Sequence, residues 1–202
     1  KQYGFDVTDI DINTSAGISW EISEDGKTLI QPLSSIKGLG VAAIKQIVNN
    51  RPFENAEDLL FKESVTYSKL NKKALDVLCR SGALDNVVDD TFTGMKHFWM
   101  SCIQNRPKNK KKMLENIQEF YDEGEFSREE QINNISDLTG IFPFDIVLSK
   151  DVKAAIQRYE VPALGDWDPE LGAAWFVPRE KIAKKTKNGK PYWILKVIDN
   201  TS

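Results

Sequence analysis

The sequence has little of what disulfide-bonded, metal-binding or membrane-spanning proteins need. It contains two cysteines, Cys79 and Cys102, one histidine, His97, and no CxxC motif, which excludes a zinc site and a disulfide framework. No run of about 18 apolar residues occurs, so we expect no membrane-spanning helix. Reduced cysteines are typical of the cytosol. We therefore expect a cytoplasmic protein without membrane contact.

The chain also lacks an excess of basic residues. Its 27 Lys and Arg residues against 30 Asp and Glu residues give a net charge of −3, without the basic footprint typical of nucleic-acid-binding proteins. Lysines nevertheless cluster at 69–73, 108–112 and 181–190, and local charge matters more to a partner than the total. At 202 residues the chain can bury a core without crosslinks. Because it begins at Lys1 without a methionine, we expect a piece of a longer protein.

The first half of the sequence predicts a β-hairpin followed by short helices. Residues 17–22 and 28–30 flank the turn signal Asp25-Gly26. An apolar helix face is expected over 41–48, ended by Asn49-Asn50-Arg51-Pro52. Asn55 and Asn71 are suitable N-caps for two further helices, and Gly82 is suitably placed to end the second.

The second half of the sequence predicts more helices and then strands. Helices are expected over 93–105, 110–121 and 150–159, and another is opened by the capping box of Ser127 and Glu130. Residues 174–177 and 192–198 alternate like strands, with the turn signal Asn188-Gly189 between them. The expected fold is therefore mainly α with a small β part.

The segment Lys37-Gly38-Leu39-Gly40-Val41 is the first with chemical meaning. Two glycines at this spacing allow a tight turn and leave unpaired N–H groups at the start of a helix, where phosphate binds. We expect Gly40 to need a backbone conformation that other residues rarely adopt. This is the pattern of a DNA-binding helix-hairpin-helix, although glycines at this spacing also form simple turns.

A second block, residues 69–85, follows the hairpin block 36–40. Two such blocks in this order resemble the tandem helix-hairpin-helix segment of C-family DNA polymerases, the family of the bacterial DNA polymerase III alpha subunit. The blocks Tyr3-Gly4-Phe5-Asp6-Val7 and Asp11-Ile12-Asn13-Thr14-Ser15 are similar to the end of its fingers. Leu138-Thr139-Gly140-Ile141-Phe142 is similar to an element before its last linker helix, and residues 184–193 are similar to the opening strands of its OB domain.

The resemblance implies four parts. Residues 1–33 would be the end of the fingers with a β-hairpin and loop, 34–90 a tandem helix-hairpin-helix domain, 91–165 a helical linker region, and 166–202 the start of an OB-type β-barrel. The family's catalytic palm would lie upstream, so we name no catalytic residue, no metal site and no cofactor here. Mg²⁺ and DNA-directed nucleotidyl transfer would belong to the parent polymerase that the resemblance implies. The acidic pairs Asp89-Asp90 and Asp9 with Asp11 are interpreted as solvated turn residues.

The resemblance also implies which residues touch DNA. The helix-hairpin-helix units would hold the phosphates of double-stranded DNA without reading its sequence, through Lys37, Gly38, Leu39, Gly40, Val41, Lys45, Lys69, Asn71, Lys72, Lys73, Ser81 and Gly82. The OB-like end would contact single-stranded template, through Trp175, Lys184, Lys185, Lys187, Tyr192 and Trp193.

Two departures from the family pattern bear on the partners. Residues 89–138 contain no good copy of the family's sliding-clamp peptide, so other replisome proteins are better-supported partners than a clamp. The His-Pro that usually follows the Leu-x-Gly-aromatic element is also missing. A bacteriophage source would explain both, which places the protein in a bacterial cell or a phage-infected host. Two other hypotheses stay open: a helix-hairpin-helix module of a repair or recombination protein, and a replisome interaction scaffold that does not bind DNA.

Overall fold

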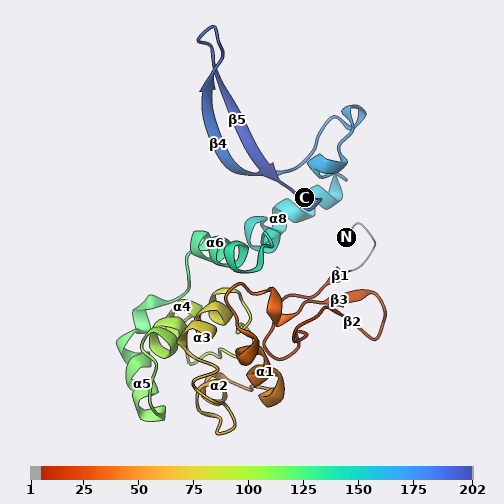
Figure 1. Cartoon of the computed structure of the whole chain (residues 1–202). Coiled ribbons are helices and arrows are strands. Elements are labelled where there is room, and N and C mark those ends of the chain that lie inside the picture. The colour runs from red at the N-terminus through yellow and green to blue at the C-terminus, as the bar shows by residue number, and fades with distance from the viewer. Residues whose placement is uncertain (1–5, 202) are drawn as a thin grey trace. The chain divides into compact units, whose positions relative to one another are not determined.

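The computed structural model of the chain describes residues 6–201 (Figure 1). These residues form two compact units, the first ending at Pro143 and the second beginning at Phe144. The boundary falls inside the stretch 91–165 that the sequence analysis treats as one helical region. Tyr3, Gly4 and Phe5 of the fingers-like block lie outside the described residues. Each unit is described by itself below.

The first unit opens with a small sheet. Strands β1 (Asp6–Val7), β2 (Glu21–Ile22) and β3 (Thr28–Ile30) lie in the order β1-β3-β2, with β2 antiparallel and β1 parallel to β3. The turn between β2 and β3 forms because the Asp25 side chain accepts a hydrogen bond from the Lys27 amide. Gly26 takes a positive φ of 69° there. The predicted hairpin is confirmed.

Three short helices follow the sheet after a 3₁₀ turn, η1 (Leu33–Ser35). They are α1 (Val41–Asn50), α2 (Ala56–Phe61) and α3 (Lys72–Arg80). Asn55 and Asn71 cap α2 and α3 as predicted, each side chain accepting a hydrogen bond from the third helical amide, at 2.9 and 3.1 Å. Gly82, with a φ of +84°, ends the turn after α3.

The rest of the first unit is helical. Helix α4 (Met95–Phe98) continues directly into a π-helical turn, η2 (Trp99–Gln104), so the expected helix over 93–105 is present with an unexpected geometry. Helix α5 (Lys110–Glu119), the 3₁₀ turn η3 (Tyr121–Glu123) and α6 (Arg128–Thr139) follow. The capping box at the start of α6 is confirmed, because Ser127 and Glu130 bond each other's backbone amides. His97 is fully buried, and its Nε2 lies 2.8 Å from the Ile117 carbonyl oxygen.

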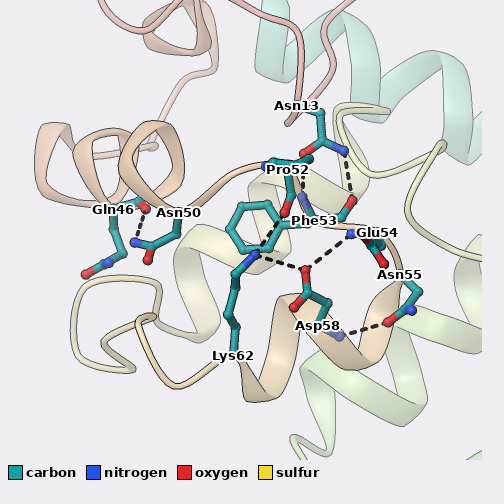
Figure 2. A network of polar contacts seen from close by, with 9 residues as sticks. All are labelled: Asn13, Gln46, Asn50, Pro52, Phe53, Glu54, Asn55, Asp58 and Lys62. Atoms are coloured by element: carbon teal, nitrogen blue, oxygen red, sulfur yellow. Dashed lines mark hydrogen bonds and ion pairs between the residues drawn. The ribbon is translucent and has the colours of Figure 1, made fainter.

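The loop after α1 is fastened by the Asn13 side chain (Figure 2). The Asn13 amide nitrogen donates to the Phe53 carbonyl at 2.9 Å, and the Phe53 amide donates to the Asn13 side-chain oxygen at 2.8 Å. Lys62 donates to the Pro52 carbonyl from the other side. Phe53 is 1% exposed, so this pairing closes the core over the aromatic ring. Asn13, from the block 11–15 that resembles the end of the fingers, therefore stabilises this unit.

The second unit begins with the helices α7 (Phe144–Val147) and α8 (Lys150–Arg158). Two 3₁₀ turns, η4 (Leu164–Asp166) and η5 (Pro169–Leu171), lead to strands β4 (Val177–Lys185) and β5 (Pro191–Ile198), which pair antiparallel. The position expected for this strand, 174–177, is wrong, because β4 begins at Val177 and continues through the lysine-rich residues to Lys185. Its lysine-rich sequence hides the alternation, and pairing with β5 imposes the extended backbone.

The expected OB-type barrel is not confirmed. In the part of the chain that the structure describes beyond Pro143, β4 and β5 form a two-stranded sheet. Two strands cannot close a barrel, which needs every strand to pair on both edges. The fold is therefore mostly helical with small sheets, and the C-terminal β part is an open hairpin.

Candidate nucleic-acid interface

The hairpin between η1 and α1 is held by its apolar residues and presents its glycines and lysine to solvent. Ile36 and Leu39 are 1% and 8% exposed, whereas Lys37, Gly38 and Gly40 lie on the surface. The Leu39 amide donates to the Ile36 carbonyl at 3.2 Å, which makes the turn tight and takes that amide out of reach of a ligand. The alternation of buried and exposed residues gives a rigid, accessible loop.

The C-terminal end of α6 is hydrogen-bonded to the same hairpin. The Lys37 amide donates to the carbonyl oxygen of Leu138 at 2.8 Å, so the Leu138-Thr139-Gly140 block contacts the hairpin directly. Gly140 has a φ of +74° at the helix end. Sequence reasoning missed this contact, because no local pattern links residues a hundred positions apart.

The two glycines of the hairpin have different roles. Gly38 has a φ of +88°, the left-handed region that favours glycine, whereas Gly40 has an ordinary extended φ of −77°. The expectation that Gly40 needs an unusual backbone is therefore wrong, because the tight bend is placed at Gly38. A Cβ added at Gly40 would meet no described atom within 4 Å. Gly40 is therefore not required by its backbone conformation, and its missing side chain leaves open space in front of α1.

The first turn of α1 offers an anion an unobstructed approach. Gly40 is its N-cap and has no side chain to bond the helix amides, so those of Val41 and Ala42 belong to the group that an α-helix cannot pair internally. Val41 is 56% exposed, Ala42 is small and exposed, and Lys45 is exposed one turn further on. Amides at a helix start with a nearby cation are suited to phosphate.

Helix α3 contributes one of its lysines to this hairpin. A Cβ at Gly38 would lie 3.8 Å from Lys73 Cε, so the Lys73 side chain runs beside the bend. Lys72 points elsewhere and donates to the Gln104 carbonyl at 3.0 Å. The Asn71 side chain is occupied as a cap, and Lys69 is exposed just before it. Of the two adjacent lysines, Lys73 is the one that joins the hairpin surface.

Ser81 and Gly82 do not join the α3 lysines. They lie beyond the other end of α3, and its nine residues separate the two ends by about 13 Å at the usual rise per residue. Ser81 is 5% exposed and its hydroxyl donates to the Leu78 carbonyl at 3.0 Å. The structure thus places the predicted second half-site on two separate surfaces.

The interpretation of Asp11 as a solvated turn residue is wrong, because Asp11 is buried and its carboxyl accepts hydrogen bonds. Burial alone would raise the pKa of Asp11, but hydrogen bonds from Asn86, Thr14 and Asn13 lower it. Asp85 keeps part of its side chain exposed, and partial desolvation of its carboxyl together with the like charges of Glu125, Asp11 and Asp9 raises its pKa to about 6. Among residues 6–201, no group of three or more His, Cys, Asp or Glu side chains has a metal-binding arrangement.

The β4–β5 hairpin places the residues expected to contact single-stranded DNA on two opposite faces. Tyr192 pairs with Lys184 and Trp193 with Ala183, and consecutive strand residues point to opposite sides. Trp193 is 58% exposed and lies under Lys181, whose ammonium is 3.9 Å from the ring centre. Lys185 and Lys187 are exposed towards the turn.

Trp175 does not belong to the same surface as the strand aromatics. It lies outside β4 and β5, and its ring packs edge-on against Phe144 with the ring centres 5.8 Å apart. Its amide donates to the Pro162 carbonyl. The structure therefore separates Trp175 from Tyr192 and Trp193.

Comparison with known proteins places the hairpin in a recognised motif. Residues 4–94 match the family described as the helix-hairpin-helix motif. The chain is 34% and 33% identical over 87 residues to the DNA polymerase III subunit alpha of two strains of Helicobacter pylori, which covers 42% of this chain and 7% of each relative. It is 35% identical over 80 residues to the subunit alpha of Pseudomonas fluorescens, which covers 38% of this chain and 6% of the relative. The resemblance to C-family polymerases is confirmed for this part, and the match spans a small fraction of the relatives' length.

No helix among residues 6–201 is long and apolar enough to cross a membrane.

Proposed function

Because the chain carries a helix-hairpin-helix motif and is similar to polymerase III alpha subunits, we propose that it binds double-stranded DNA as part of a replicative C-family polymerase. The observation that carries this proposal is the exposed Lys37–Gly40 hairpin in front of α1, with open space at Gly40 and Lys73 beside Gly38. DNA synthesis, Mg²⁺ and replisome partners belong in this proposal to the parent protein, in the cytoplasm of a bacterium or a phage-infected cell.

The groups that carry this proposal are backbone amides and lysines, which are suited to phosphates. Backbone amides and lysines contact phosphate oxygens, and such contacts position a duplex without carrying sequence information. A hairpin with its neighbouring lysines can neutralise about four phosphates, which predicts a log–log salt slope of about −3.6. We therefore propose binding without sequence preference.

Fluorescence anisotropy of the 202-residue chain with two unrelated duplexes tests the proposal. We expect equal affinities for both duplexes and a steep fall of affinity with salt. No binding at low salt would favour the scaffold hypothesis, and a strong preference for one sequence would contradict the proposed mode.

Substitution of Gly40 separates binding from folding. Gly40→Ser adds a side chain in open space and supplies an N-cap oxygen, so the fold should be as stable as the parent or slightly more stable. The same side chain would occupy the amides and obstruct a phosphate, so affinity for the duplex should fall at least about tenfold. Equal affinity of the Ser variant would show that the hairpin is only a turn.

The two adjacent lysines of α3 should differ in their effect on duplex binding. Lys73→Ala should weaken the affinity for the duplex more than Lys72→Ala, because Lys72 is bonded to the Gln104 carbonyl.

The β4–β5 hairpin supports a second proposed contact, with single-stranded template. Residues 177–198 carry seven Lys or Arg residues and one acidic residue, Glu180, and Trp193 exposes its ring between them. Base stacking on one aromatic face with surrounding cations is the usual mode of single-strand binding. Trp193→Ala should lower affinity for an oligothymidine strand, whereas Trp175→Ala should change it little, since Trp175 packs on Phe144. Equal effects of the two variants would contradict this assignment.

A further inference from the structure

Two basic segments far apart in the sequence lie side by side in the first unit. Residues 69–73 and 104–112 together hold eight Lys or Arg residues and no acidic residue, in a chain whose net charge is −3. Lys72 donates to the Gln104 carbonyl at 3.0 Å, and Arg106 donates to the Leu70 carbonyl at the same distance. The start of α3 thus joins the hairpin, through Lys73, to the segment before α5.

Arg106 acts in this arrangement as a positioning residue. Its guanidinium lies over the Tyr67 ring, 4.0 Å from the ring centre, and its Nη1 donates a hydrogen bond to the Leu70 carbonyl. Burial lowers the pKa of Arg106, in keeping with a side chain used inside the fold. It fixes the 104–108 segment against the loop before α3, and Lys108 follows two residues later on the surface.

The lysines at the start of α5 divide into paired and unpaired ones. Lys110 forms an ion pair with Glu57 at 2.7 Å, and Lys112 forms one with Glu115 at 3.4 Å. Lys108 and Lys111 are exposed, and no ion pair found among residues 6–201 includes either. Their charges are therefore available to a partner.

The position of these two charges is unfavourable for the helix itself. The first turn of α5 has no acidic residue, and positive charge near a helix N-terminus opposes the helix dipole. Asn109 already caps the helix, its side chain accepting from the Lys112 amide at 2.9 Å, so the lysines are not needed for capping. An external anion would offset this unfavourable arrangement.

We propose that Lys108 and Lys111 form a second phosphate-binding surface that extends the helix-hairpin-helix contact along the same DNA duplex. This inference rests on the proposed DNA-binding function and adds a segment beyond the residues 4–94 that match the motif. The duplex would pass from the Lys37–Gly40 hairpin over Lys73 and the start of α3 to Lys108 and Lys111. Because both contacts are to backbone phosphates, they add affinity and salt dependence but no sequence preference.

The test uses two double variants of the 202-residue chain. Lys108→Ala with Lys111→Ala removes the unpaired charges. Lys112→Ala with Glu115→Ala removes an ion pair from the same exposed helix and leaves the net charge unchanged. Both variants are titrated with a 25-base-pair duplex by fluorescence anisotropy over a range of salt concentrations, and circular dichroism confirms that each is folded.

With Lys108 and Lys111 added to the hairpin contacts, we expect a parent slope of about −5.4. Lys108→Ala with Lys111→Ala should return the slope to about −3.6, which is shallower by about 1.8, and should weaken binding roughly tenfold at moderate salt. The ion-pair variant should keep the parent's slope. One outcome would overturn this inference and leave the proposed function standing. In that outcome the parent binds the duplex, Gly40→Ser lowers the affinity, and Lys108→Ala with Lys111→Ala binds the duplex as tightly as the parent. If the parent itself does not bind the duplex, the proposed function fails and this inference with it.

Discussion

At the scale of single residues, identical side-chain types have different roles because their surroundings differ. Asp11 and Asp85 are both aspartates of the first unit, yet hydrogen bonds lower the pKa of Asp11 while partial desolvation and neighbouring carboxylates raise that of Asp85. Lys72 and Lys73 are adjacent, yet one bonds a carbonyl and the other runs beside Gly38. The chemistry of each residue follows from its contacts.

Asp85 makes the stability of the protein depend on pH in a defined direction. Its pKa is about 6 in the folded state against 3.8 for the free residue, so the folded state binds the proton more tightly between these values. The contribution of Asp85 to stability is therefore fully present below about pH 4 and falls as the pH rises to about 6. Asp85→Asn keeps the shape and removes this titration.

We expect Asp85→Asn to raise the melting temperature relative to the parent more at about pH 7.5 than at about pH 4.5. Thermal unfolding followed by circular dichroism at the two pH values measures the difference. Asp90→Asn is the control, because it removes the same charge outside the group of carboxylates that surrounds Asp85. A gain from Asp85→Asn that is equal at both pH values would contradict the raised pKa.

At the scale of elements, the π-helical turn η2 depends on a side chain from the next helix. Asn116 of α5 is 1% exposed, and its side-chain nitrogen donates to the carbonyls of Ser101 and Asn105, at 2.8 and 2.5 Å. The Ser101 hydroxyl donates back to the Asn116 carbonyl at 3.3 Å. A π-helix shifts the usual backbone pairing by one residue, and Asn116 supplies a donor where η2 ends.

Removal of this donor should destabilise the first unit. Asn116→Ala leaves the buried Ser101 carbonyl without its partner, which should lower the free energy of unfolding by about 2–3 kcal/mol. Gln118→Ala, on the exposed side of the same helix, should change it by less than about 0.5 kcal/mol. Urea unfolding of both variants measures the two values. A small effect of Asn116→Ala would mean that another group satisfies the end of η2.

At the scale of the whole molecule, the two units differ in how much apolar surface they bury. The core cluster draws its residues from Ile10 to Leu138, all within the first unit. Of the residues described beyond Pro143, Ala163 is the one apolar residue that is buried. A two-stranded hairpin with little core is marginally stable in water. The candidate hairpin thus rests on a large buried core, whereas the C-terminal unit has little core of its own.

Hydrogen exchange measured by mass spectrometry on the whole chain should show this difference. We expect amides of β4, β5 and α8 to exchange at least about a hundred times faster than those of α1 and α3, because local opening there exposes little apolar surface. Equal protection in both units would contradict this expectation, and would show that the second unit is stabilised by contacts beyond its own core.

Much of the secondary structure could be predicted because its signals are local. Asn55, Asn71 and Ser127 each cap the helix that follows, as a short polar side chain before an apolar run predicts. The Asn188-Gly189 turn joins β4 and β5 for the same local reason. The β4 strand and the π geometry of η2 could not be predicted, because their partners come from other segments: β5 pairs with β4, and the Asn116 side chain of α5 bonds carbonyls at the end of η2.

The sequence by itself determined the helix caps, the turns and the resemblance of residues 36–40 and 69–85 to the helix-hairpin-helix segment of C-family polymerases, because each rests on neighbouring residues. Only the tertiary structure decided how the candidate site is assembled. It put the bend at Gly38, brought Lys73 and not Lys72 to that bend, and buried Ser81 with its hydroxyl bonded to the Leu78 carbonyl. It also set Arg106 against Leu70. These outcomes depend on how helices pack and which way each side chain points, and spacing along a chain does not contain that information.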